Sequence, residues 1–448
     1  MPTRAICLLL GSLVVAPPAA RAAGDRPEPA PGDWPGHLGP HRNGEYLGPP
    51  LAATWPADGP PRRWSKSIGS GYAAPSVAGR RLVLFHRVGD EARIECLDAV
   101  TGDALWSTDY PSDYDDSFDF DDGPRAAPAI AGGRVFCFGA EGRLTAVDLE
   151  SGKVVWKCDT RATYRPAESF FGAACSPLVE DGRVIVNVGG REERPAPRAP
   201  AGGGAVTGDA RPPRKSGVVA FDAATGSELW TALDDEASYS SPVAADFAGE
   251  RLLVLFTRSY VVVLDPADGS ERYRKRWRAR IHASVNAATP LVAGERIFAT
   301  TSYGVGALLL RHTAKGSFEE VWSNDASLSS HFATPVEHDG FLYGFHGRQE
   351  GGTPLRCVEL ASGSVRWSEA QPATARFGTG SLILAGDRLV MLSDEGELLL
   401  AVADPAGFRR VASASILGSG IRAHAALAHG RYYARDKSRL VCVDLAAH

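Results

Sequence analysis

The sequence lacks the short motifs that mark many enzymes and metal sites. It contains no G-x-S-x-G, no H-E-x-x-H and no G-x-x-x-x-G-K-[ST] phosphate loop, and its eleven histidines do not cluster at ligand spacing. The cysteines form no C-x-x-C and no adjacent pair, which argues against a thiolate metal site. No carboxylate pair stands out for acid–base chemistry. A pair of carboxylates that only the folded chain brings together is the alternative.

Helical periodicity and long apolar runs are also scarce. Beyond the first 20 residues, no useful length of chain repeats its apolar positions every 3.6 residues. Near the start, Arg4 precedes a short apolar run at 5–15, and a small-x-small cleavage site follows. We therefore expect a signal peptide at 1–22, a periplasmic or secreted protein, and no transmembrane segment after cleavage. An uncleaved anchor is the alternative.

The chain carries little net charge, which limits its partners. Its formal charge is -5, and loss of Arg4 and Arg21 with the signal peptide changes it to -7. A mildly acidic surface gives no bulk attraction to nucleic acid or to anionic lipid. We expect no nucleic-acid partner.

Six cysteines follow the expected signal peptide, and three of them share the same local sequence position. These three stand two residues before an acidic turn residue: Cys96, Cys357 and Cys442. At such a place a thiol serves as a small buried hydrophobic group. We expect free thiols, although an exported protein can form disulfides and Cys158–Cys175 is the nearest candidate pair.

The feature that the chain does have is a repeated phrase. The segment LDAVTGDALW at 97–106 returns as VDLESGKVVW at 147–156, and looser copies occupy 221–230, 264–273 and 358–367. In the clear copies an Asp and a Thr or Ser bond the turn backbone, and Gly supplies a positive φ. A second strand then ends in an aromatic residue, so each copy is a hairpin with an aromatic anchor.

Another pair of short strands precedes each hairpin, and together they predict the fold. Most of these pairs follow an Ala-Pro, Ser-Pro or Thr-Pro step, and fainter forms begin near residues 380 and 424. The chain therefore holds eight units of roughly 45–50 residues with four strands each. This pattern is typical of an all-β, eight-bladed β-propeller of four-stranded antiparallel blades.

The two ends of the chain predict how the ring closes. The last unit ends before a Trp-bearing fourth strand, whereas an unattached strand with Trp64 lies at 60–67. We expect this N-terminal strand to complete the last blade, which removes two exposed sheet edges. Deletion of 60–67 should then prevent folding. The propeller spans 60–448 after an N-terminal segment at 23–59. The expected anchors are Trp64, Trp106, Trp156, Trp230, Tyr273, Trp322 and Trp367.

Three stretches depart from the repeat. Residues 189–217 are rich in Pro, Gly, Ala and Arg, and we expect a disordered loop within blade three. Seven aspartates gather at 109–122, where we expect a solvated loop, with a cation site as the alternative. The basic run at 272–280 should protect the outer edge of blade four, with a polyanion or partner patch as the alternative.

The repeated phrase resembles the tryptophan-docking repeat of the pyrroloquinoline-quinone-like (PQQ-like) β-propeller superfamily. The segment WPGHLGPHRNG at 34–44 is similar to the opening of exported bacterial members, and the resemblance covers 34–448. It implies that each terminal Trp packs against the neighbouring blade near its turn Gly. Noncatalytic members include the propeller lipoprotein of the outer-membrane protein assembly machine, but this chain lacks a lipid-anchor cysteine.

The resemblance implies two functional classes. We favour a noncatalytic, exported binding or scaffold protein that acts as a monomer. The alternative is a quinoprotein alcohol dehydrogenase, in which the quinone lies over the central channel near calcium, against a vicinal disulfide and a Trp floor. This sequence has no adjacent cysteines, and Trp34, Trp55 and Trp277 are its Trp residues outside the expected anchors. We expect no cofactor and no metal, with PQQ and calcium belonging only to the alternative.

A binding site should lie at the mouth of the central channel, where the segments before the first strands converge and differ between blades. Their arginines and aromatics suit an anionic or aromatic small ligand, a peptide carboxylate or an unknown protein partner. The alternative is that they only fill and hydrate the channel. The candidate residues are Tyr72, Arg125, Phe171, Tyr239, Asn286, His331, Phe332, Arg376, Phe377, Arg422 and His424.

Overall fold

The computed structural model describes most of the chain. It covers residues 29–118, 120–167, 169–190, 215–314, 316–348, 352–369 and 379–447. The expected signal peptide lies outside these ranges, as does most of the expected disordered loop, so both stay predictions. No helix in the described ranges is long and apolar enough to cross a membrane.

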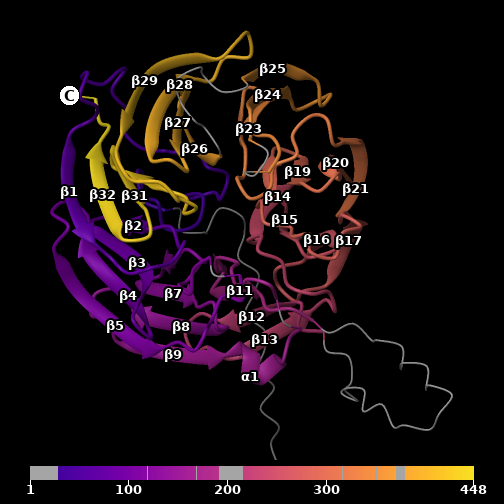
Figure 1. The fold of residues 1–448 in the computed structure, drawn as a ribbon. Coiled ribbons are helices and arrows are strands. Elements are labelled where there is room, and N and C mark those ends of the chain that lie inside the picture. Colours follow the sequence, from indigo (N-terminus) through magenta and orange to yellow (C-terminus); the bar gives the residue numbers. More distant parts are fainter. Residues whose placement is uncertain are drawn as a thin grey trace, which may run out of the picture.

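The described residues form eight four-stranded antiparallel sheets around a central axis (Figure 1). Blade one contains β2 (Ser76–Ala78), β3 (Arg81–Val88), β4 (Glu91–Asp98) and β5 (Ala104–Pro111). Blade two contains β6 (Ala129–Ala131), β7 (Arg134–Phe138), β8 (Arg143–Asp148) and β9 (Val154–Asp159), followed by helix α1 (Thr160–Tyr164). Blade three contains β10 (Leu178–Glu180), β11 (Arg183–Asn187), β12 (Val218–Asp222) and β13 (Glu228–Ala232).

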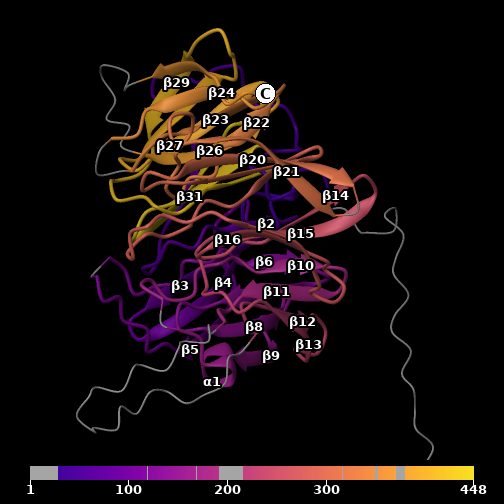
Figure 2. The same cartoon turned by 90° about the vertical axis from the view of Figure 1, so that its right-hand side faces the viewer.

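The next three blades repeat this order, with the first strand innermost and the fourth at the rim. Blade four contains β14 (Val243–Phe247), β15 (Glu250–Phe256), β16 (Tyr260–Leu264) and β17 (Glu271–Arg276). Blade five contains β18 (Leu291–Ala293), β19 (Arg296–Thr301), β20 (Gly306–Ala314) and β21 (Ser317–Asn324). Blade six contains β22 (Val336–His338), β23 (Phe341–Phe345), β24 (Leu355–Glu359) and β25 (Val365–Glu369). From the side, the third strands β12, β16, β20 and β24 follow one another in this order (Figure 2).

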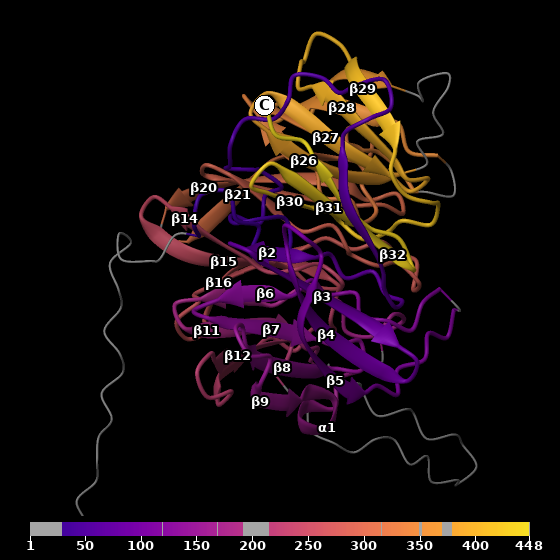
Figure 3. The same cartoon turned by 90° about the vertical axis from the view of Figure 1, so that its left-hand side faces the viewer.

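The last two blades bring the chain back to its beginning. Blade seven contains β26 (Gly380–Ala385), β27 (Arg388–Ser393), β28 (Glu397–Val402) and β29 (Arg409–Ser415). Blade eight contains β30 (Ala426–Ala428), β31 (Arg431–Arg435), β32 (Arg439–Asp444) and β1 (Arg62–Ser67). Strand β1 pairs antiparallel with β32, which places Trp64 opposite Cys442 (Figures 1 and 3). The predicted eight-bladed fold and its closure by an N-terminal strand are confirmed.

The middle strands of each blade are buried on both faces because the neighbouring blades cover them. Val261–Leu264 in β16 is a continuous apolar run with no exposed side chain. At the rim, by contrast, β1 alternates between exposed and partly buried residues, as a half-covered strand does. The core is therefore a series of apolar layers between successive blades.

A Trp at the end of one blade docks on the hairpin turn of the next. Trp156 Nε1 donates a hydrogen bond to Ala223 O at 3.0 Å, and its ring lies against Gly226. A Cβ at Gly226 would come within 2.6 Å of the ring, and the φ there is +75°. Glycine is therefore required by both the close approach and the backbone conformation. Equivalent indole hydrogen bonds come from Trp64, Trp106, Trp230, Trp322 and Trp367.

Two junctions depart from this arrangement. Between blades four and five, Tyr273 packs on Phe318 with ring centroids 5.5 Å apart, and Trp277 Nε1 donates to Gly306 O at 3.1 Å. In blade seven the anchor position holds Ala412, which has no ring to dock on the next blade. The junction of blades seven and eight is instead covered by the N-terminal segment.

The N-terminal segment, described from residue 29, also crosses the channel. Trp34 is buried and exchanges two backbone hydrogen bonds with Val77 of blade one, at 2.9 and 2.8 Å. The buried Arg42 guanidinium donates to Pro177 O, next to blade three, at 2.9 Å. The segment thus contacts blades that lie apart around the ring.

Further contacts carry the same segment to the other side of the axis. Tyr46 N donates to Leu384 O of blade seven at 2.7 Å, and its hydroxyl accepts from Gly430 N of blade eight at 2.7 Å. His37 Nε2 lies 3.1 Å from Thr289 Oγ1, before the inner strand of blade five. Because these partners surround the axis, the segment closes one end of the central channel.

The Ser-Pro and Thr-Pro steps link the innermost segments of neighbouring blades. Ser176 Oγ accepts from Ala127 N at 2.9 Å, and Ser241 Oγ accepts from Ser176 N at 2.9 Å. Thr289 and Thr334 hydroxyls continue the series into blades five and six, at 3.3 and 2.9 Å. These bonds fix the segments that carry the residues of the channel mouth.

Candidate functional site

A cavity of about 450 Å³ lies at the channel mouth, and His37 of the N-terminal segment contributes to its lining. Most of its other residues come from the segments that precede the innermost strands. Eight of the eleven residues predicted for the mouth line this one cavity: Tyr72, Arg125, Phe171, Tyr239, His331, Phe332, Arg422 and His424.

The remaining three predicted residues do not line it in the described structure. Asn286 is buried, and its amide donates to Thr257 O and Arg258 O at 3.0 Å each. It therefore holds a turn of blade four and is wrong as a mouth residue, because the backbone consumes its donors. Arg376 and Phe377 lie outside the described residues.

Several lining residues were not predicted from the sequence. Phe118 and Phe120 stand between aspartates in the acidic segment, and Tyr303 lies in the turn between β19 and β20 rather than before an inner strand. The sequence did hold a signal for Phe118 and Phe120, because apolar rings are unusual in a solvated acidic loop. The further unpredicted residues include His37, Phe170, Ile281 and Arg348.

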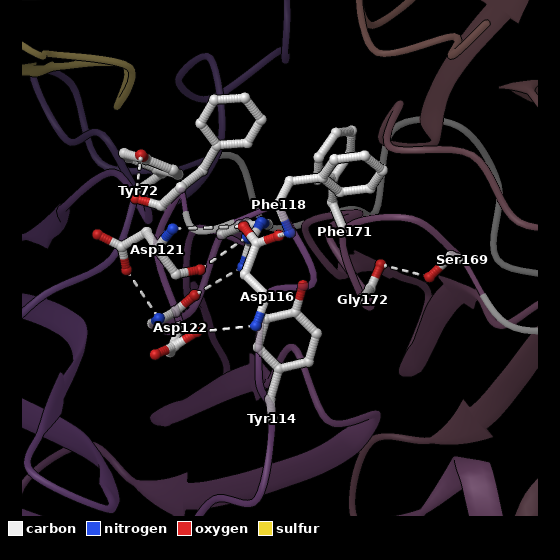
Figure 4. A network of polar contacts seen from close by, with 12 residues as sticks. Tyr72, Tyr114, Asp116, Phe118, Asp121, Asp122, Ser169, Phe171 and Gly172 are labelled. Atoms are coloured by element: carbon white, nitrogen blue, oxygen red, sulfur yellow. Dashed lines mark hydrogen bonds and ion pairs between the residues drawn. The ribbon is translucent and has the colours of Figure 1, made fainter. Parts of the chain in front are cut away.

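Aromatic rings form one wall of the cavity. Phe171 is at the centre, with ring centroids 5.3 Å from Phe118, 6.0 Å from Phe120 and 5.4 Å from Tyr239. Figure 4 shows Phe118 and Phe171 side by side above the acidic segment. Phe118 is 50% exposed and Phe120 is 39% exposed, so this wall continues outward as an apolar rim.

The acidic segment is folded, and the expectation of a solvated loop is wrong for Asp116 and Asp121. Asp116 is 2% exposed; it accepts from Phe118 N at 3.0 Å and from Arg125 Nη2 at 2.6 Å (Figure 4). Asp122 Oδ1 in turn accepts from Asp116 N at 2.8 Å. The carboxylates thus hold the loop that presents the phenylalanines.

The cation alternative for this segment also finds no support in its geometry. Its buried carboxylates are directed at backbone N–H groups and at Arg125. Among the residues that the structure describes, no three His, Cys, Asp or Glu side chains are grouped as metal ligands. The aspartates therefore have a structural role in the loop.

One arginine in the lining, Arg422, carries its positive charge into the cavity. Arg422 lies over the Phe120 ring at 4.6 Å and the Tyr72 ring at 5.8 Å, and within the described ranges it forms no ion pair. Arg125 is neutralised by Asp116. No Asp or Glu is among the described residues that line the cavity.

Burial shifts the pKa values of three other lining residues, His37, Tyr239 and His424, towards their neutral forms. Burial raises the pKa of Tyr239 to about 12, and it lowers the pKa of His424 to about 4. Burial, and then the neighbouring His424, lower the pKa of His37, whose ring meets that of His424 edge-on at 5.2 Å. These three side chains are therefore uncharged at neutral pH, where Arg422 keeps its positive charge.

Another polar pair lies on the side of blades five and six. Tyr303 Oη and His331 Nε2 are 2.8 Å apart, and the Arg348 guanidinium lies 4.7 Å from the Tyr303 ring centroid. His282 contacts Phe170 edge-on and is not among the lining residues.

The lining does not fit calcium and a quinone in the arrangement that the resemblance implies. The described lining residues include no Trp to form a floor, no Cys to form a vicinal disulfide and no carboxylate to hold calcium. All six cysteines in the described ranges are free, and burial raises the pKa of Cys175 to about 12. Cys158 and Cys175 are not bonded to each other.

The basic run begins at the rim of blade four, as predicted, and part of its charge is matched. Arg272 pairs with Asp265 at 2.7 Å, Arg274 with Glu271 at 2.6 Å, and Lys275 with Glu320 of the next blade at 2.8 Å. Acidic neighbours therefore compensate these three cations.

Comparison with known proteins identifies the family. A family model described as "Outer membrane protein assembly factor BamB" matches residues 51–192, 90–275 and 214–447. The structure of BamB from Moraxella catarrhalis superposes with a TM-score of 0.60 at 12% identity, covering 87% of this chain and 98% of that chain. Quinohemoprotein alcohol dehydrogenase from Comamonas testosteroni gives 0.61 at 13% identity, covering 93% and 81%. At these identities the two structures show a shared fold.

Similarity in sequence to a characterised enzyme is confined to part of the chain. Quinohemoprotein alcohol dehydrogenase ADH-IIG of Pseudomonas putida is 30% identical over 146 residues, which is 32% of this chain and 17% of that enzyme. Because the family model matches nearly the whole propeller, the chain belongs to the family of PQQ-like β-propellers that this model describes as outer membrane protein assembly factor BamB.

Proposed function

We propose that this protein is an exported, noncatalytic binding protein that takes a ligand in the cavity at its channel mouth. The observation that carries the proposal is the lining itself. Aromatic rings surround Arg422, and the described lining has no carboxylate. Such a site favours a ligand with an anionic group on an apolar or aromatic body.

Calorimetric titration with 3-phenylpropionate tests this proposal. We expect saturable binding, and roughly three- to tenfold weaker binding by Phe118→Ala, which removes apolar contact area from the rim. Leu229→Ala is the matched control, since Leu229 is 48% exposed on the rim strand β13 and does not line the cavity. Failure of this acid and of a panel of larger aromatic acids to bind would contradict the proposal.

A quinoprotein dehydrogenase is the second candidate, favoured by the partial sequence similarity to quinohemoprotein alcohol dehydrogenases. The proposed binding role predicts that purified protein forms no tight, absorbance-detected complex with pyrroloquinoline quinone and calcium. It also predicts no dye reduction with an alcohol under these conditions. Either signal would replace the binding role with the enzymatic one.

Export is part of the same proposal and has its own test. A chain that begins with a positive residue, a short apolar run and a small-x-small site should be cleaved after export. We expect the mature protein to begin near residue 23, which amino-terminal sequencing of the exported protein would show.

A further inference from the structure

The cavity has one open end, and this limits what shape of ligand can occupy it. On the inner side, His37 lines the cavity and lies 3.1 Å from Thr289, while Trp34 and Arg42 of the same segment are buried against blades one and three. A polypeptide therefore cannot pass through the channel. It can enter only with a chain end or a tight turn.

The charge of the cavity distinguishes between the two ends of a chain. Arg422 is stacked on aromatic faces and forms no ion pair within the described ranges, so the donors in its guanidinium plane remain suited to a carboxylate. The described lining holds no Asp or Glu to receive an amino terminus. An amino terminus would be repelled, whereas a carboxyl terminus would gain a charge-assisted hydrogen bond.

The apolar surface extends beyond what a small ligand would cover. Phe118, Phe120 and Ile281 line the cavity yet are 50%, 39% and 56% exposed, so they form a rim around its opening. Clustered exposed apolar side chains of this kind mark interaction sites. A chain that leaves the cavity would cross this rim and cover it, whereas a molecule confined to about 450 Å³ would leave it in water.

We propose that the occupant of the cavity is the carboxyl-terminal end of a polypeptide whose last side chain is apolar or aromatic. The terminal carboxylate pairs with Arg422, the last side chain packs on the Phe171 wall, and the preceding residues cross the rim. This inference rests on the proposed binding function and names the class of its ligand.

Fluorescence anisotropy with labelled peptides tests the inference on the full mature protein. The probe is the hexapeptide GSGSVF with fluorescein at its amino terminus and a free carboxyl terminus. Its matched controls are the same peptide as a C-terminal amide and a peptide labelled at its carboxyl end with a free amino terminus. The small acid 3-phenylpropionate serves as competitor.

We expect the free-acid peptide to bind roughly tenfold or more tightly than the amide, because the amide lacks the charge that Arg422 recognises. Arg422→Gln should remove this difference, because the acid then loses the cation that distinguishes it from the amide. Arg280→Gln is the control variant, because Arg280 is exposed near the same mouth and does not line the cavity. A melting temperature for Arg422→Gln close to that of the wild type would show that the variant is folded.

The possible outcomes separate this inference from the function on which it rests. Equal binding of the acid and amide peptides, or binding of 3-phenylpropionate without binding of any peptide, overturns the inference and leaves a small-ligand site. Binding of neither peptide nor acid overturns both. Preference for the free amino terminus would also overturn the inference, since it reverses the assigned polarity.

Discussion

The rim and the mouth of this propeller use the same blades in opposite ways. At the rim, one arrangement recurs: an indole donates to a turn carbonyl, and its ring lies on a turn glycine, as Trp106 does at Gly152. At the mouth, by contrast, the contributing blades present different side chains, such as Tyr72, Arg125 or His331. The recurrent contacts maintain the ring, which leaves the non-recurrent positions available for recognition.

One junction of the rim, between blades seven and eight, has no docked ring. Where Ala412 replaces the aromatic anchor, the N-terminal segment covers the seam instead: Leu51 forms a bridge with Ala446, and Gly59 packs on Ala414. The same segment closes the channel below the cavity. The junction without a docked indole and the floor of the site therefore depend on one stretch of chain.

The largest loss of stability is expected when a docked indole is removed from the rim. Trp156→Ala should lower the free energy of unfolding by about 3–5 kcal/mol, because it removes a buried ring and its hydrogen bond to Ala223. Val155→Ala is the matched control, since Val155 is 42% exposed on the same strand and should change stability by well under 1 kcal/mol. Denaturant melts measure both; a loss below 1 kcal/mol for Trp156→Ala would contradict its anchoring role.

The next largest effect on stability is expected at the mouth, where His424 makes the free energy of unfolding depend on pH. The folded-state pKa of His424 is lowered to about 4 by burial, so the unfolded chain binds more protons below about pH 6.5. Stability should therefore fall as the pH drops from about 6.5 towards about 4, with a contribution from this group on the order of 2 kcal/mol.

The variant His424→Gln isolates this effect from the carboxylates that titrate in the same range. We expect this variant to lose less stability than the wild type as the pH falls. Denaturant melts at pH 7, 6, 5 and 4.5 measure the difference. Trp156→Ala should shift the whole curve and keep its slope, because the rim indole carries no titrating group. Identical slopes for His424→Gln and the wild type would argue against a neutral, buried imidazole.

The smallest expected change in global stability is at the loop that presents the aromatic wall. Asp116→Asn weakens the pair with Arg125 and the acceptors for two backbone N–H groups. Because the loop can open locally, we expect faster hydrogen exchange over 112–124 and little change in the melting temperature. Asp115→Asn is the control, since Asp115 is exposed. Unchanged exchange in Asp116→Asn would show that the carboxylate does not hold the loop.

Sequence reasoning was accurate where a residue's role recurs and weaker where it depends on distant neighbours. The hairpin phrase specified the blades, and the stray strand with Trp64 specified the closure. Asn286 was misplaced because nothing local shows that its amide bonds to Thr257 O and Arg258 O. Asp116 was taken for a solvated residue because its partner Arg125 becomes apparent only when the loop is folded.

The sequence by itself determined the repeat, the number of blades and the seam, because these follow from local hairpin chemistry and from counting. The tertiary structure alone decided the site. His37, Phe118, Tyr303 and Arg422 come from four distant stretches of chain and meet only because a closed ring directs their segments to one axis. Convergence of this kind leaves no period in the sequence, since the blades that line the cavity supply different residues.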